Sequence, residues 1–130
     1  MRPAGVLLAL LLALPLAQPQ EARADTKKQS STPNRFGAIA FHRPAQAWGV
    51  AYDFARARDA NVHALKQCVN PQCEVVHKFR NGCAAIADGS RAFAAASGAT
   101  RTEAEAKAQR KCNEQNKNQS CNVLAWACTR

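Results

Sequence analysis

Cysteine thiols are the reactive groups that stand out in this chain. The sequence has 6 cysteines in 130 residues. Cysteines at this density form disulfides in exported proteins, whereas in a cytosolic protein they more often bind metal or act in catalysis. The compartment and the spacing therefore decide which chemistry applies. The six are Cys68, Cys73, Cys83, Cys112, Cys121 and Cys128.

Hydrolytic chemistry would need a nucleophile and a general base. The three histidines His42, His63 and His77 are the candidate bases. The serines and threonine nearest to a predicted hairpin lie within residues 90–100, outside any strand–turn–helix elbow. The carboxylates are scattered rather than paired, unlike those of glycoside hydrolases. The sequence assigns no catalytic residue and no cofactor, and a small secreted hydrolase is kept as an alternative.

The charge of the chain indicates anionic partners. Lysine and arginine number 18 against 9 aspartates and glutamates, a formal net charge of +9. Basic exported proteins meet acidic proteins or anionic envelope polymers. Nucleic acid is not the expected partner, because the basic residues of segment 102–113 alternate with glutamates and no groove-binding motif is present.

The first 24 residues are typical of a secretory signal peptide. Arg2 is followed by an apolar run over residues 6–14 and by Ala22-Arg23-Ala24, a small-x-small cleavage site. The apolar run is too short to span a membrane. We therefore expect an exported protein, periplasmic or extracellular, with no membrane span in the mature chain. Residues 25–35 are polar and predict a flexible linker.

Hydrophobic periodicity predicts four elements in residues 36–79. Residues 36–41 and 46–54 predict two strands that form a hairpin. Residues 58–68 predict a helix whose inward stripe includes Ala60 and Ala64, widened by Val62 and Leu65. Residues 73–79 predict a third strand.

The second part of the chain repeats this order with different side chains. Strands are predicted at 83–87, 91–97 and 121–129, with a helix from a capping box at Thr102–Glu105 to about residue 113. Matching segments are 38–40 with 85–87, 47–51 with 92–96, and 73–76 with 121–124. The sequence thus predicts an α+β fold of two tandem strand–strand–helix–strand repeats. They would share one antiparallel or mixed sheet, with both helices on one face, in a single duplicated domain over residues 36–130.

The repeat narrows the pairing of the six cysteines. Cys68 and Cys112 end the two predicted helices, and Cys73 and Cys121 open the strands that follow. Each repeat would therefore contain its own disulfide, Cys68–Cys73 and Cys112–Cys121. The two remaining cysteines would pair as Cys83–Cys128. A zinc site at Cys68 and Cys73 with His63 and His77 is the alternative.

Four residues are candidates for binding. Trp126 corresponds to Lys78 in the first repeat, a residue type that normally faces water, so we expect Trp126 to be exposed beside Lys78. His42 and Arg43 lie in a predicted turn. Trp48, by contrast, shares a bulky strand face with Val50, Tyr52 and Phe54 that should meet the core.

Several spaced motifs resemble a known family of exported bacterial proteins. They include Gly-Ala-Ile-Ala at 37–40, Arg-Asn-Gly-Cys-Ala-Ala-Ile-Ala at 80–87 and Cys-Asn-Val-Leu-Ala-Trp-Ala-Cys at 121–128. The family is domain of unknown function 4189, and the likeness covers residues 36–129. The chain departs from the family at residues 92–96, where relatives often have Trp and Gly. The resemblance implies a secreted bacterial domain and supplies no catalytic residues.

The function expected from the sequence is therefore a secreted or periplasmic, non-enzymatic binding module. Its partner would be another protein, as for a protein inhibitor or immunity-type protein. The alternatives are a binder of an anionic cell-envelope polymer and the small secreted hydrolase.

Overall fold

A computed structural model describes residues 32–130. The predicted signal peptide over residues 1–24 and the linker up to residue 31 lie outside this range. Residues 32–35 have no regular structure. Among the described residues, no helix is long and apolar enough to cross a bilayer.

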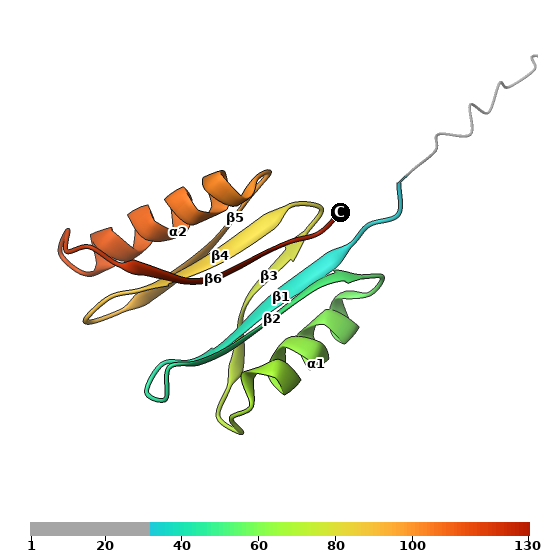
Figure 1. The fold of residues 1–130 in the computed structure, drawn as a ribbon, viewed down its shortest axis with the longest axis horizontal. Helices are drawn as coiled ribbons and strands as arrows, with labels where there is room; N and C mark the ends of the chain where they lie inside the picture. The colour runs from blue at the N-terminus through green and yellow to red at the C-terminus, as the bar shows by residue number, and fades with distance from the viewer. Residues whose placement is uncertain (1–31) are drawn as a thin grey trace, which may run out of the picture. The chain divides into compact units, whose positions relative to one another are not determined.

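Two three-stranded antiparallel sheets and two helices make up the described fold (Figure 1). The first sheet has the strand order β2-β1-β3 and the second has the order β5-β4-β6. In each, the central strand comes first in the chain. The elements are β1 (Phe36–His42), β2 (Ala47–Phe54), α1 (Ala57–Cys68), β3 (Glu74–Arg80), β4 (Cys83–Asp88), β5 (Phe93–Gly98), α2 (Arg101–Gln115) and β6 (Asn122–Cys128).

The α+β class is confirmed, but the prediction of one shared sheet with both helices on one face is wrong. The two central strands β1 and β4 are buried on both of their faces. One face of each sheet is covered by a helix and the other by the opposite sheet. Uninterrupted apolar runs such as residues 37–41 are typical of strands covered on both sides.

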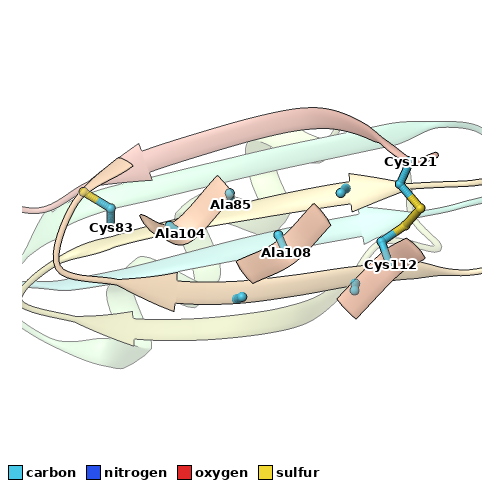
Figure 2. Close-up of a cluster of buried hydrophobic side chains, with 9 residues drawn as sticks. Cys83, Ala85, Ala104, Ala108, Cys112 and Cys121 are labelled. Carbon is cyan, nitrogen blue, oxygen red and sulfur yellow. A yellow bond between two sulfur atoms is a disulfide. The ribbon is translucent and has the colours of Figure 1, made fainter. Parts of the chain in front are cut away.

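Small side chains allow each helix to lie close to its sheet. In the second sheet, Ala104 and Ala108 of α2 pack against Ala85 of β4, and the Cys112–Cys121 disulfide closes one end of the cluster (Figure 2). In the first sheet α1 approaches so closely that a Cβ on Gly49 would lie 2.2 Å from the Ala64 carbonyl oxygen. The small side chains on this face of β2 permit the close approach of α1.

The larger apolar side chains lie between the two sheets. Ile39 and Phe79 of the first sheet cluster with Ile86 and Ala125 of the second. The Phe41 and Phe93 rings pack edge to face across the sheets, with their centroids 5.1 Å apart. Strand β2 contacts β6 at one junction of the sheets, and β3 contacts β5 at the other.

The three disulfides of the described chain have the pairing predicted from the sequence: Cys68–Cys73, Cys83–Cys128 and Cys112–Cys121. Two connect a helix end to the following strand. The third joins directly opposite residues of β4 and β6. Because Cys68 and Cys73 are bonded to each other, they are not available as the zinc thiolates of the alternative site.

Several side chains differ from their predicted burial. Trp48 and Tyr52 do not enter the core, because β2 is an edge strand and the sheets leave its outer part uncovered. A bulge in the β1–β2 ladder turns Phe54 to the α1 side. Val62 and Leu65 of α1 are exposed, because the helix meets the sheet through its alanine stripe alone.

The start of α2 also differs from the prediction. The N-cap is Thr100, whose hydroxyl accepts from the Glu103 backbone N–H at 3.2 Å. The Glu103 carboxylate accepts in turn from the Ala99 backbone N–H at 3.1 Å. The predicted capping box at Thr102–Glu105 is therefore two residues too late, because a second Thr with a Glu three positions on occurs directly upstream.

Candidate functional site

Trp126 of β6 is exposed, as predicted. Its side chain is 41% exposed and lies on the outer face of the second sheet, opposite Ala85 of β4. The guanidinium carbon of Arg101, the first residue of α2, lies 3.9 Å from the centre of the indole ring. The Arg101 Nε donates to Glu105 Oε1 at 2.7 Å. The stacked pair is a cation–π contact held in place by a helical ion pair.

A hollow of about 420 Å³ joins Trp126 to the edge of the first sheet. Tyr52 of β2, 53% exposed, lines it together with Asp53 and Arg130. The Arg130 backbone N–H donates to Asp53 Oδ1 at 2.6 Å, so the end of the chain is tied to the bulge of β2. The hollow thus spans the β2–β6 junction and has an aromatic ring from each sheet.

A third large aromatic side chain lies on the same edge strand. Trp48 is 42% exposed and precedes Tyr52 by four residues on β2, so both rings leave the strand on the same side. Trp48 does not line the hollow, so we give the name aromatic surface to Tyr52, Trp126 and Arg101. Tryptophan, tyrosine and arginine are the side chains that most often dominate the binding energy of protein interfaces.

Arg43, a predicted binding residue, is engaged in a contact between the two sheets. Its Nε donates to Asp88 Oδ1 at 2.8 Å and its second terminal nitrogen donates to the Gly89 carbonyl at 2.7 Å. Gln46 donates to the other oxygen of the same carboxylate. Arg43 therefore holds the β1–β2 turn against the β4–β5 turn.

His42 lines a separate hollow of about 530 Å³ together with Arg43, Glu74 and Phe93. This hollow lies at the opposite junction from the aromatic surface, because Phe93 belongs to β5 and Glu74 to β3. His42 and Trp126 therefore do not form one site.

Lys78 is exposed, but it does not lie beside Trp126 as predicted. Lys78 of β3 pairs with Ala38 of β1 and faces the α1 side of the first sheet. Trp126 of β6 pairs with Ala85 of β4 and faces the α2 side of the second sheet. The two residues occupy matching positions on different sheets. Equivalent positions in the two halves therefore do not place Lys78 and Trp126 side by side.

The structure brings His77 and Ser97 together. The His77 Nε2 and the Ser97 Oγ are hydrogen-bonded across the β3–β5 junction. His77 is half-buried and Ser97 is exposed. Burial, followed by the charge of Lys111, lowers the pKa of His77 below its usual 6.5. The ring is therefore neutral at neutral pH and its Nε2 can accept a proton.

His63 is part of a local contact on α1. Its ring lies 5.0 Å from the Phe54 ring, and its Nε2 is 2.9 Å from the Gln67 side-chain nitrogen. The neighbouring Asp59 binds Arg56 at 2.8 Å. The side-chain contact between Asp59 and His63 that their spacing permits is replaced by these two pairs.

Sequence reasoning missed Tyr52, Arg101 and Ser97. Tyr52 lies on the bulky strand face assigned to the core, and only the edge position of β2 exposes it. Arg101 and Ser97 act through partners distant in sequence, Trp126 and His77. One feature of the sequence could have indicated the exposure of Tyr52: the adjacent Asp53, a charged residue near the end of an otherwise apolar strand.

The comparisons with known proteins concern the fold and the family. No curated protein is significantly similar to the chain. The NMR structure of Rv1813c from Mycobacterium tuberculosis is similar to 98% of this chain and 96% of that chain, with a TM-score of 0.54 and 23% sequence identity. At this identity the likeness shows the fold alone. The family model "Domain of unknown function (DUF4189)" matches residues 36–128, so the chain belongs to this family.

Proposed function

We propose that this protein is a secreted or periplasmic, non-enzymatic module that binds another protein through the aromatic surface. The observation that carries the proposal is the exposed indole of Trp126, stacked with Arg101 next to the exposed ring of Tyr52. Exposed aromatic groups of this size gathered at one junction are typical of interaction sites.

The rigidity of the scaffold supports this proposal. Trp126 lies two residues before Cys128, which is disulfide-bonded to Cys83. Arg101 begins a helix whose other end is held by the Cys112–Cys121 disulfide. Side chains that are already held in place lose little conformational freedom on binding, which favours affinity.

An acidic partner fits the charge of the chain. The formal net charge is +9. In the part that the structure describes, Arg101 and Arg130 border the aromatic surface, and Asp53 is engaged by the Arg130 backbone. An acidic patch on a partner would speed association and fix its orientation. We propose as the partner an imported toxin or a wall-degrading enzyme that has such an acidic patch and that the bound module inhibits.

Export and duplication complete the proposal. The signal peptide expected over residues 1–24 leads the chain to an oxidising compartment, with which the three disulfides are consistent. Two tandem repeats sharing one ancestry are supported by the order β–β–α–β in both halves. They are supported further by the matching registers, such as Ile39 opposite Val50 and Ile86 opposite Ala95.

Affinity capture with matched variants tests the function. The wild type and the Trp126→Ala variant would be immobilised and exposed to the exported proteins of a bacterium that makes this chain. We expect a partner protein that the wild type retains at moderate salt and that Trp126→Ala binds roughly 30-fold more weakly, as for an interface hot spot. Lys78→Ala, at the matching position of the other sheet, is the control and should bind normally.

Two outcomes would contradict this function. One is a partner that binds Trp126→Ala as tightly as the wild type. The other is retention of envelope polymer only, lost steeply as salt rises, which would favour the anionic-polymer alternative.

A small secreted hydrolase is the second candidate, and the His77–Ser97 hydrogen bond favours it. Ser97 Oγ would attack an ester carbonyl while His77 Nε2 takes its proton, and that proton would then go to the departing alcohol. Water would release the acid from Ser97. Labelling by a fluorophosphonate probe that is lost in Ser97→Ala and His77→Ala, but kept in His42→Ala, supports it. An unlabelled wild type ends this candidate.

A further inference from the structure

Four strands form the edges of the two sheets in the described chain: β2, β3, β5 and β6. An edge strand presents backbone N–H and C=O groups that no neighbouring strand satisfies. Proteins commonly protect such strands from pairing with other chains by bulges or charged side chains. The four edges can therefore be compared by how well they are protected.

Three of the four edges have a bulge. The register of β2 shifts near Asp53, which has a positive φ of 63°. The register of β3 shifts opposite Ile39 and Ala40, and that of β6 shifts opposite Ile86 and Ala87. Strand β3 also has several charged side chains, among them Glu74, Lys78 and Arg80. These irregularities interrupt the row of outward-facing backbone groups.

Strand β5 has none of these protections. Its pairing with β4 runs without a shift from Cys83 opposite Gly98 to Asp88 opposite Phe93. Its sequence, Phe-Ala-Ala-Ala-Ser-Gly, has no charged residue and no proline. Helix α2 covers one face of β5 and the first sheet contacts the other, but within residues 32–130 no strand pairs with its outer side.

We propose that β5 is a second docking site, where an extended segment of another protein adds to the sheet as a fourth strand. Its small side chains let the added backbone approach, and its regular ladder offers donors and acceptors at the two-residue spacing of a strand. The site lies at the β3–β5 junction, away from the aromatic surface, and does not depend on the function proposed for that surface.

The charge around β5 selects an acidic segment. Arg91 is exposed two residues before the strand begins, and Lys111 of α2 lies near enough to this junction for its charge to act on His77. Both cations lie near the start of β5, because Cys112, the neighbour of Lys111, has its Sγ 3.6 Å from the Ala92 carbonyl oxygen. A segment with an acidic residue at the end that meets this part of β5 would complement both. A second copy of this chain would instead bring its own excess of basic residues to the contact, so we commit to a segment of a different protein.

Amide hydrogen exchange on the full chain tests the proposal. The probe is the peptide acetyl-Glu-Thr-Val-Thr-Val-Thr-Glu-amide, which favours an extended backbone and has acidic ends. We expect the peptide to slow exchange at alternate amides of residues 93–98 and to leave β2, the corresponding but bulged strand, unchanged. The same peptide N-methylated at alternate residues cannot form the ladder and should bind at least about tenfold more weakly.

The charge of the probe gives the second comparison. A peptide with lysines in place of both glutamates should bind several times more weakly than the acidic one. Three results would each overturn the proposal. They are unchanged exchange in β5 on adding the acidic peptide, equal binding of the N-methylated peptide, and a concentration-dependent dimer in sedimentation that protects β5 without any peptide.

Discussion

The two junctions between the sheets have the same architecture and different chemistry. At the β2–β6 junction Tyr52 and Trp126 are exposed around a hollow. Tyr52 corresponds to Ser97 of β5, because the residues before them, Ala51 and Ala96, pair with the equivalent residues of β1 and β4. Trp126 corresponds to Lys78 of β3, because they too pair with equivalent residues of β4 and β1. The β2–β6 junction thus presents aromatic side chains, whereas the β3–β5 junction presents the hydrogen-bonded pair His77 and Ser97 and the unpaired edge of β5.

Comparing the two halves distinguishes residues that stabilise the fold from residues that are available for binding. The positions that both halves fill alike are buried: Ala60 and Ala104, Ala64 and Ala108, and Ile39 and Ile86. Several positions that differ between the halves lie at the surface, such as Tyr52 and Ser97, or hold one half together, such as Cys83 and Cys128. Substitutions at the differing positions therefore test the comparison most sharply.

The largest expected effect concerns the Cys83–Cys128 disulfide, since the first half has Phe36 opposite Arg80 at the matching place. Replacing both cysteines with alanine opens a link of sequence separation 45 and should lower the free energy of unfolding by about 4 kcal/mol. Replacing Cys68 and Cys73 should cost about 2 kcal/mol, because that loop is short. Urea unfolding measures both, and equal losses would remove the asymmetry between the halves.

Asn116 is the next asymmetry. Its side chain, in a residue only 1% exposed, accepts from the Arg91 and Ala92 backbone N–H groups and donates to the Ala92 and Cys112 carbonyls. Asn116→Ala should cost about 3 kcal/mol, because buried backbone groups lose their partners. The same unfolding measurement checks it. A loss below about 1 kcal/mol, the usual net value of one hydrogen bond, would show that water replaces the amide.

Gly49 and Ala94 occupy matching positions on β2 and β5. Gly49→Ala should destabilise by about 1–3 kcal/mol, since the new methyl group would meet the backbone of α1. The reciprocal Ala94→Gly change should cost only about 0.5–1 kcal/mol, through backbone entropy. Comparing the denaturation midpoints of the two variants tests whether α1 lies closer to the first sheet than α2 lies to the second. A stabilising Gly49→Ala would contradict that geometry.

The smallest effect is a pH dependence that arises from a histidine of the first half. His77 lies opposite Ile39, and the matching residue opposite Ile86 is Ala125. Because the folded-state pKa of His77 is lowered, the unfolded chain binds more protons below pH 6.5. Stability should therefore fall as the pH drops through 6.5 toward the folded-state pKa. Unfolding curves of the wild type and His77→Asn from about pH 7.5 to about pH 5.5 measure the difference, and parallel pH profiles would contradict it.

The sequence predicted the local elements and the disulfides well, because both follow from short-range patterns. The alanine stripe with Cys68 at its end predicts a helix that finishes at a disulfide, and the repeated stripe ending at Cys112 predicts a second one. The exposure of Trp126 followed from comparing it with Lys78. These inferences need no knowledge of how the sheets are arranged.

The arrangement of the sheets could not be derived in the same way. Continuous apolar strands such as β4 fit the centre of one large sheet as well as two stacked sheets. The exposure of Tyr52, the contact of Arg43 with Asp88 and the pair of His77 with Ser97 all depend on that choice. The two contacts join residues of different sheets, and the exposure of Tyr52 depends on where the second sheet ends. Local sequence patterns do not predict either feature.

Site-specific photo-crosslinking in cells would show whether the aromatic surface binds a partner protein. p-Benzoyl-phenylalanine would replace Tyr52, Trp126 or Lys78 in the full chain, one position at a time, in cells that export it. We expect positions 52 and 126 to crosslink to the same acidic protein and position 78 not to crosslink to it. No protein adduct at positions 52 and 126, or the same adduct at position 78, would contradict the assignment of binding to the aromatic surface.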